Sequence, residues 1–249
     1  MSEKLITGLF YKNGFELKNG PKWGMSLKAA GSMRFRWNEY NENRVQFLDE
    51  LKGTNYSIAQ IELIHSKKVF DIDNIDNHTE YIGDGLITRN KKIIPTVTVA
   101  DCMPIYLYEP TSGVFGMLHS GWKGTGIVKE AIIKACEIYG AKREEFCVVM
   151  GPHIHECCYK VDEERADYFR KNFSDDCVTA DNRLSLAKAN LAVLRELGIQ
   201  ENNIVICNDC TSCNEKFGSF RRETSLLPEN TPLEIKQKKF TVQAAWVKW

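Results

Sequence analysis

Residues 93–119 constrain the fold of this chain more than any other segment. They hold three apolar runs rich in β-branched and aromatic residues, at 93–100, 103–108 and 114–119. The sequence Glu-Pro-Thr-Ser-Gly between the second and third runs is typical of a turn. We therefore predict a β-hairpin here, which requires antiparallel pairing within the sheet.

Helices and further strands are predicted on both sides of this segment. Apolar periodicity and stop signals predict helices near 41–51, 126–139, 162–173 and 186–198, and strands near 146–151, 204–207 and 240–247. Because strands and helices alternate while the hairpin adds antiparallel pairing, we expect an α/β (α+β) sandwich with a mixed sheet flanked by helices. The chain has no repeat or linker, so residues 1–249 are predicted to be a single domain.

Composition narrows the class of partner. Lys and Arg number 33 and Asp and Glu also number 33, so the formal net charge is zero, which argues against nucleic-acid and anionic-membrane partners. No run approaches the roughly 18 apolar residues of a membrane span, and the first residues lack the apolar core of a secretory signal. We expect a cytoplasmic protein whose nine cysteines are mostly reduced.

The hairpin also suggests a metal site. If the chain turns at Pro110 and Thr111, Cys102 lies directly opposite His119, with Cβ atoms about 4.5–5.5 Å apart. A thiolate and an imidazole at that spacing can share one cation, and His65, at the end of another apolar stretch, is a candidate third ligand. Such a set with an open fourth position is typical of catalytic zinc. From spacing alone, unrelated strand residues fit equally well.

The loop after His119 contains Gly121, Gly124 and Gly126 and leads directly into a predicted helix. Glycines let backbone N–H groups approach an anion, and a helix N-terminus adds a favourable dipole. Lys123 adds a positive charge beside them. The loop is therefore a candidate phosphate site, although glycines in such turns also serve purely steric needs.

Two further groups of metal-binding residue types stand later in the chain. Cys207, Cys210 and Cys213 form a Cys-x-x-Cys-x-x-Cys motif that resembles half of a structural zinc site. No fourth ligand is obvious nearby, so we expect reduced thiols.

The second group is the segment 153–158, which contains two histidines and a Cys-Cys pair. We interpret it as a solvent-facing loop, with an accessory metal site as the alternative. His78 lies in a polar stretch and is expected at the surface.

Four motifs in this order, ADCMPIYLYEP, HSGWKG, GPHIHECCYKV and NDCTSCNEKFGSFRR, resemble the laccase-domain family, also called the multicopper polyphenol oxidase family. The resemblance implies a single-domain α/β sandwich with zinc-dependent purine nucleoside phosphorylase and adenosine deaminase activity. It implies that the metal ligands are His65, Cys102 and His119, and that the pocket also includes Arg44, Asp84, Asp101, Lys123 and Arg221.

The resemblance also suggests roles for these residues. Asp101, Cys102 and His119 would be catalytic, with Asp101 orienting His119 or carrying a proton. The residues expected to bind substrate or phosphate are Arg44, Asp84, Lys123 and Arg221. The implied partners are phosphate and a purine nucleoside, in a monomer or weak homo-oligomer. Lys123 replaces the family's usual Arg, which keeps the charge but loses bidentate phosphate geometry.

Three alternatives remain at this stage. Five histidines are too few for a true multicopper oxidase, but a single blue-copper site with Met103 or Met117 as axial ligand fits the count. A metal-free hydrolase could use Cys102 as nucleophile and His119 as base. An amidase that edits peptidoglycan precursors could use the same pocket.

Overall fold

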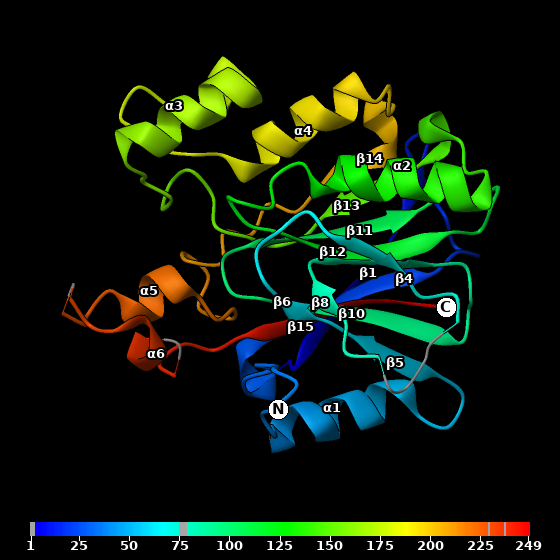
Figure 1. The fold of residues 1–249 in the computed structure, drawn as a ribbon, viewed down its shortest axis with the longest axis horizontal. Coiled ribbons are helices and arrows are strands. Elements are labelled where there is room, and N and C mark those ends of the chain that lie inside the picture. Colours follow the sequence, from blue (N-terminus) through cyan, green and yellow to red (C-terminus); the bar gives the residue numbers. More distant parts are fainter. Residues whose placement is uncertain (1–2, 75–78, 229, 237) are drawn as a thin grey trace.

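Two β-sheets packed against each other form the centre of the molecule, with helices on both outer sides (Figure 1). The computed structural model describes residues 3–74, 79–228, 230–236 and 238–249. His78, expected at the surface, lies outside these residues. Within the described residues, one sheet has five strands in the order β1-β4-β15-β10-β5 and the other has six in the order β14-β13-β11-β12-β9-β7.

The strands are short, and two small ladders, β2 with β3 and β6 with β8, lie beside the main sheets. The five-stranded sheet contains β1 (Leu5–Leu9), β4 (Lys22–Ser26), β5 (Ser57–Gln60), β10 (Ile93–Val99) and β15 (Gln243–Lys248). The six-stranded sheet contains β7 (Val69–Asp71), β9 (Gly85–Thr88), β11 (Met103–Tyr108), β12 (Phe115–Ser120), β13 (Cys147–Met150) and β14 (Ile204–Ile206). The small ladders are formed by β2 (Tyr11–Lys12), β3 (Phe15–Glu16), β6 (Glu62–Leu63) and β8 (Ile82–Gly83). Both main sheets combine parallel and antiparallel pairs, which confirms the predicted mixed pairing.

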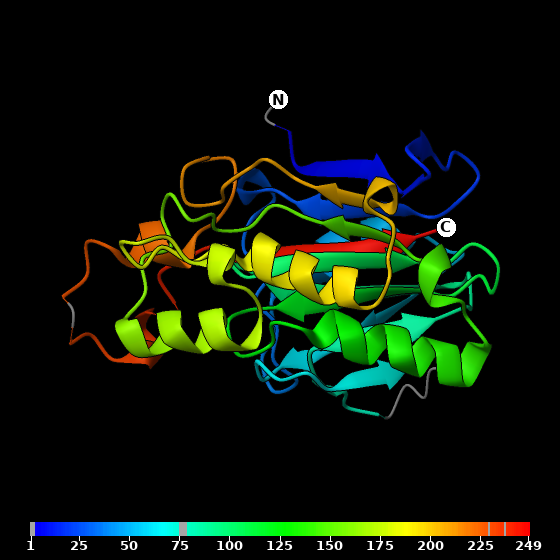
Figure 2. The same ribbon diagram turned by 90° about the horizontal axis from the view of Figure 1, so that it is seen from above.

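The longer helices cover the outer sides of the two sheets, while two short helices near the C-terminus lie beside one end of the sheets, as Figures 1 and 2 show. The helices are α1 (Glu42–Lys52), α2 (Ile127–Tyr139), α3 (Glu163–Asn172), α4 (Leu186–Glu196), α5 (Phe220–Thr224) and α6 (Leu233–Lys236). Short 3-10 turns occupy Lys28–Ala30, Arg143–Glu145, Asp175–Cys177 and Glu201–Asn203. No helix among the described residues has the length and apolar character needed to cross a bilayer.

Three apolar clusters hold these layers together. The side chains of Val97 on β10 and Met117 on β12 belong to the cluster between the two sheets. On the outer face of the six-stranded sheet, α2, α3 and α4 bury their apolar sides. On the outer face of the other sheet, Phe47 of α1 packs against Trp246 of β15. Each fully buried large apolar side chain contributes about 1.5–3 kcal/mol, so the α/β sandwich predicted from the sequence follows from its apolar patterning.

The hairpin of β11 and β12 forms, but its register differs from the prediction. Pro104, not Cys102, pairs with His119. The connecting loop contains four residues, because Glu109 N donates to Val114 O at 2.8 Å and Gly113 takes a left-handed φ of 77°. The predicted register was therefore wrong by two positions. A two-residue shift preserves the side of the sheet on which a residue lies.

This loop generates a testable prediction. Glu109 is fully buried, and its carboxylate accepts hydrogen bonds from Thr111 N and Ser112 N, both at 2.7 Å. Glu109→Ala should lower the free energy of unfolding by about 2 kcal/mol, because hydrogen bonds to a charged group are lost. Chemical denaturation measures the change. Glu109→Gln keeps an acceptor oxygen and should lose less; equal stability of wild type and Glu109→Ala would contradict this account.

Candidate metal centre

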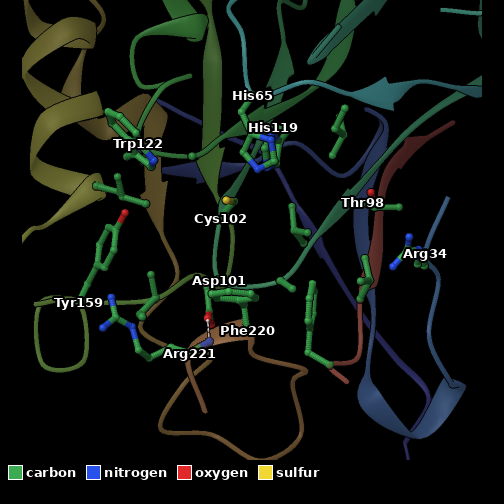
Figure 3. A pocket seen from close by; sticks show the side chains of 18 of the residues that line it. Arg34, His65, Thr98, Asp101, Cys102, His119, Trp122, Tyr159, Phe220 and Arg221 are labelled. Carbon is green, nitrogen blue, oxygen red and sulfur yellow. Dashed lines mark hydrogen bonds between the residues drawn. The ribbon is translucent and has the colours of Figure 1, made fainter. Parts of the chain in front are cut away.

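Three side chains from separate segments converge at one end of the sheets. His65 follows β6, Cys102 precedes β11, and His119 lies in β12. Their candidate ligand atoms all lie within 4.8 Å of one another. The two imidazole rings are nearly perpendicular, with centroids 4.9 Å apart (Figure 3). The structure thus brings together the three residues expected to bind the metal, although the hairpin register differs from the one that first suggested them.

The backbone near this cluster adopts uncommon conformations. His65 has φ of 58° and Asp101, directly before Cys102, has φ of 76°. Residues other than glycine rarely occupy this left-handed region, and each instance costs about 1–3 kcal/mol. Hydrogen bonds hold the His65 position, since its N–H donates to Asp84 Oδ1 at 3.0 Å.

Asp84 organises the ligands from a fully buried position between β8 and β9. Its Oδ1 lies 2.9 Å from His119 Nδ1, and its Oδ2 accepts from Ser66 N at 2.6 Å and Ser66 Oγ at 2.7 Å. Burial raises the pKa of Asp84, but the bonds from His119 and Ser66 outweigh it and leave the pKa lowered. An ionised Asp84 keeps a proton on Nδ1 and directs Nε2 of His119 toward Cys102. The sequence had suggested Asp101 either for this orienting role or as a proton carrier, and Asp101 makes its hydrogen bonds elsewhere.

The cluster favours a thiolate. Burial raises the pKa of the Cys102 thiol, but the charge of His119 and hydrogen bonds from His119 and His65 lower it to about 6. Burial lowers the pKa of His119, and the Cys102 thiolate and Asp84 raise it above its usual value. Metals bind cysteine as the thiolate. One thiolate and two imidazoles with a free side toward a cavity fit a tetrahedral ion with an open position.

The glycines after His119 leave room for the ligands. A Cβ on Gly121 would lie 2.8 Å from Cys102 Sγ, closer than such atoms approach. The N–H of Gly126 donates to Asn190 Oδ1 at 3.3 Å, and the N–H of Ile127 donates to a loop carbonyl at 3.0 Å. The amides of Gly126 and Ile127 are therefore already bonded, and Gly121 serves close packing against Cys102.

A cavity of about 470 Å³ opens beside the cluster. This volume is sufficient for a small organic ligand. In Figure 3 the two imidazoles lie at one end, Tyr159 and Arg221 at one side, and Arg34 at the other. The aromatic and cationic lining residues are Phe35, Trp122, Tyr159, Phe220, Phe240, Arg34, Arg36, Arg165 and Arg221.

Three residues expected to bind substrate or phosphate do not line this cavity. One of them, Asp84, is fully buried against His119 and Ser66. The Arg44 guanidinium donates to Gln60 Oε1 at 2.9 Å and Met33 O at 3.0 Å, and it lines a separate cavity beside α1. Lys123 Nζ lies 5.2 Å from the centre of the Trp122 ring, and Lys123 is not among the residues that line the main cavity. Neither side chain is positioned by this structure to bind a phosphate beside the metal cluster.

Asp101 lines the cavity but bonds away from His119. It is 8% exposed, and its carboxylate accepts from Thr211 Oγ1 at 2.7 Å, Ser219 Oγ at 3.0 Å and Arg221 N at 2.7 Å. Burial raises the pKa of Asp101 despite these donors. The carboxylate therefore holds two segments, the chain around residue 211 and the start of α5, close to Cys102.

Sequence reasoning missed Arg165 and Tyr159. The Arg165 guanidinium carbon lies 4.4 Å from the centre of the Trp122 ring, and its buried Nε has no hydrogen-bond partner in the described part of the chain. Burial and the nearby Cys102 raise the pKa of Tyr159 to about 12. The Arg221 guanidinium lies 5.7 Å from the centre of the Tyr159 ring. Helical periodicity around Arg165 predicted a helix and gave no signal that its first turn reaches the pocket.

Comparisons with known proteins identify the family and the fold of this chain. The profile of the family described as multi-copper polyphenol oxidoreductase laccase matches residues 32–226. A purine nucleoside phosphorylase from Clostridium acetobutylicum is 32% identical over 172 residues, covering 67% of this chain and 71% of the relative. A protein named adenosine deaminase, from an unknown prokaryotic organism, is 34% identical over 164 residues, covering 62% of each chain.

A solved structure shows the same fold. The crystal structure of the Bacillus licheniformis hypothetical protein YfiH superposes with a TM-score of 0.78 at 23% identity. The superposition covers 94% of both chains. The mixed α/β architecture is therefore shared along nearly the whole length.

The Asp84 contacts predict the behaviour of a variant. Asp84→Asn should weaken zinc binding at the cluster about 10–100-fold, because loss of a carboxylate that orients a ligand histidine has effects of this size. The measurement is the free zinc concentration that protects Cys102 from alkylation, read by mass spectrometry of its peptide, with folding checked by circular dichroism.

A matched control for this variant is Asp73→Asn. Asp73 accepts from Thr88 Oγ1 at 3.0 Å and from Arg89 N at 2.9 Å, so its carboxylate bonds a segment other than the three ligand segments. Equal zinc protection of Cys102 in the two variants would show that Asp84 does not organise the ligands.

Proposed function

This chain belongs to the multi-copper polyphenol oxidoreductase laccase family, and we propose that it is a zinc-dependent purine nucleoside phosphorylase that also deaminates adenosine. The observation that carries the proposal is the cluster of His65, Cys102 and His119 at the end of a cavity lined by aromatic rings and arginines. The names of the two relatives support both activities. The proposed substrates are adenosine, inosine, guanosine and methylthioadenosine, with phosphate as co-substrate.

The residues present fit zinc. Zinc prefers nitrogen and sulfur ligands. The cluster offers two imidazole nitrogens and one sulfur, and it leaves one side open toward the cavity. A zinc ion held there supplies Lewis-acid chemistry at neutral pH. The chain's own contribution is to hold the ligands, with Asp84 keeping the Nδ1 proton on His119.

Arg165 and Arg221 are the proposed phosphate-binding residues. Both lie near Tyr159 and line the same cavity as the cluster of His65, Cys102 and His119. Guanidinium groups bind phosphate oxygens in a bidentate manner. The unpartnered, buried Nε of Arg165 is available for such a bond. In this proposal Arg165 joins Arg221, which the sequence already suggested, in place of Arg44 and Lys123, which do not line the cavity.

Aromatic side chains supply a surface for the purine. Phe220 and Phe240 pack edge to face with centroids 5.2 Å apart, and both line the cavity. Phe35 lines the same cavity. Planar bases stack on such rings, which also exclude water from the reacting part of the nucleoside.

The structure does not favour a blue-copper site. The thioether of Met103 accepts a hydrogen bond from Asn190 Nδ2 at 3.8 Å, and Met117 lies in the core between the sheets. Neither methionine lines the cavity beside the cluster, so neither is placed as an axial ligand. The second imidazole, His65, distinguishes the cluster from the simple nucleophile and base pair of a thiol hydrolase.

The decisive experiment incubates the purified protein with adenosine, with and without phosphate. Phosphorolysis yields adenine and ribose 1-phosphate, whereas deamination yields inosine. A chelator should abolish both products and zinc should restore them, while His119→Ala should yield neither. Full activity after metal removal would favour the thiol hydrolase. Cleavage of peptidoglycan precursors without action on nucleosides would favour the amidase.

The role of Arg165 generates a kinetic prediction. Arg165→Ala should raise the KM for phosphate about 10–100-fold, which corresponds to the loss of one or two charge-assisted bonds. The KM for adenosine in deamination should change far less, because that reaction uses no phosphate. Steady-state kinetics of both reactions measure the two constants.

Arg170→Ala is the matched control on the same helix. The Arg170 guanidinium bonds Asp167 at 2.8 Å and Asn182 at 2.9 Å, and Arg170 is not among the cavity-lining residues. An Arg165→Ala variant whose two KM values rise together would contradict a phosphate-specific role.

A further inference from the structure

We propose that Cys157, Cys158, Cys210 and Cys213 form a second metal site, which binds one structural zinc ion. This site is separate from the cluster of His65, Cys102 and His119 and does not depend on the proposed enzymatic activity. From the sequence, Cys207, Cys210 and Cys213 resembled half of a zinc site without a fourth ligand. The structure keeps Cys210 and Cys213 and adds two cysteines from a segment about fifty residues earlier.

The distances fit a single tetrahedral ion. The four sulfur atoms all lie within 4.8 Å of one another. The sulfur of Cys157 is 3.8 Å from that of Cys158 and 3.6 Å from that of Cys213, and the Cys158 and Cys213 sulfurs are 3.3 Å apart. Zinc–sulfur bonds of about 2.3 Å in a tetrahedron place the sulfurs about 3.8 Å apart. A disulfide would require about 2.05 Å.

Local backbone bonds aim the four sulfurs at one point. The chain turns tightly at both pairs, since Cys158 N donates to His155 O at 3.0 Å and Cys213 N donates to Cys210 O at 3.1 Å. His155 N also donates to Cys210 Sγ at 3.4 Å. An amide N–H directed at a sulfur stabilises the thiolate form that a metal requires.

The pairing of the two segments corrects an expectation. His153 was placed in a solvent-facing loop, but it is only 1% exposed and forms a parallel bridge with Cys210. Its Nδ1 lies 2.8 Å from Gly151 O. The segment 153–158 is therefore anchored from within, and its cysteines face those of the later motif.

Cys207 belongs to the sequence motif but not to the proposed four-cysteine site. It belongs to the Cys-x-x-Cys-x-x-Cys pattern, but its N–H donates to Met150 O at 2.9 Å as β14 ends. Its side chain packs against the core between the sheets. Cys207 therefore lies outside the cluster and provides a matched control within the same motif.

The donor set indicates a structural rather than a catalytic ion. Four thiolates complete the tetrahedral coordination of zinc and leave no open position. Four neighbouring thiolates without a cation would repel one another strongly. An ion here would cross-link the loop after β13 to the loop after β14, two segments that meet beside the cavity.

This cross-link would act on the pocket through Asp101. Thr211, between the two later cysteines, donates to Asp101 Oδ1 at 2.7 Å. Ile154, near the two earlier cysteines, donates through its N–H to Asp101 O at 2.9 Å. Tyr159 directly follows Cys158 and lines the cavity. The second ion would therefore hold one wall of the cavity in place.

The test is metal analysis of protein purified under reducing conditions, by inductively coupled plasma mass spectrometry. We expect two zinc ions per chain in the wild type and in Cys207→Ser, and one in Cys213→Ser. Cys213 is exposed, so its replacement disturbs little packing. Equal zinc content in the wild type and Cys213→Ser would overturn the proposal.

A second variant isolates the site from the first cluster. The double variant His65→Ala, His119→Ala should still bind one cobalt(II) ion, with the intense thiolate charge-transfer absorption of a four-sulfur site, and zinc should displace it. Failure to bind cobalt or zinc, or a Cys158–Cys213 disulfide in peptide maps of the reduced protein, would overturn the second site. One zinc in the wild type that persists in this double variant would support the second site and contradict the proposed catalytic metal.

Thermal denaturation provides a readout besides metal content. Because metal binding to a closed site contributes folding free energy, Cys213→Ser should lower the midpoint by about 5–10 °C relative to Cys207→Ser. Addition of a chelator should produce the same shift in the double histidine variant. An unchanged midpoint in both experiments would contradict a structural role.

Discussion

The bond between Asp84 and His119 is the contact on which the candidate catalytic centre depends. A carboxylate in a fully buried position is costly unless it is paired and hydrogen-bonded. Asp84 meets this condition only through the ligand segments, by its bonds to His119 Nδ1 and to the backbone of His65 and Ser66. The ligands therefore satisfy the buried charge, and the charge fixes the ligands. The sheets place Asp84, since it joins a strand of the small β6–β8 ladder to β9 of the main sheet.

Local patterning predicted much of the fold, and it named the three side chains that the structure brings together, but it did not predict the distances between them. The buried face of α2 follows directly from its apolar spacing, and Gly140 ends it in a left-handed conformation. The hairpin register depended on Glu109, whose carboxylate bonds the loop amides and lengthens the turn. Propensity rules identify turn residues but do not reveal a buried acid that selects between turns of two and four residues.

Long-range convergence explains the remaining differences. Arg44 of α1 was expected in the pocket, but Gln60 and Met33 hold its guanidinium away from it. Arg165 does reach the pocket, from a helix whose sequence pattern showed only that it is amphipathic. The four-cysteine cluster combines two pairs that neither segment completes alone. The sequence motif also contains Cys207, but the side chain of Cys207 packs against the core and does not belong to the cluster. Such sites depend on which loops the sheet order places together, and this order is not a local property of the sequence.

The two clusters that could hold a metal ion differ in ways that suit different tasks. The cluster of His65, Cys102 and His119 has three donors and faces a cavity, so a reactant can approach it. The cluster around Cys210 has four thiols and lies at the surface, with Cys157 and Cys213 exposed. Asp101 connects them, because its backbone precedes Cys102 while its carboxylate and carbonyl bond the segments that carry the four cysteines. A strained φ at Asp101 is maintained only if those segments stay fixed. The proposed structural ion would thus help to hold the backbone that presents the thiol of Cys102.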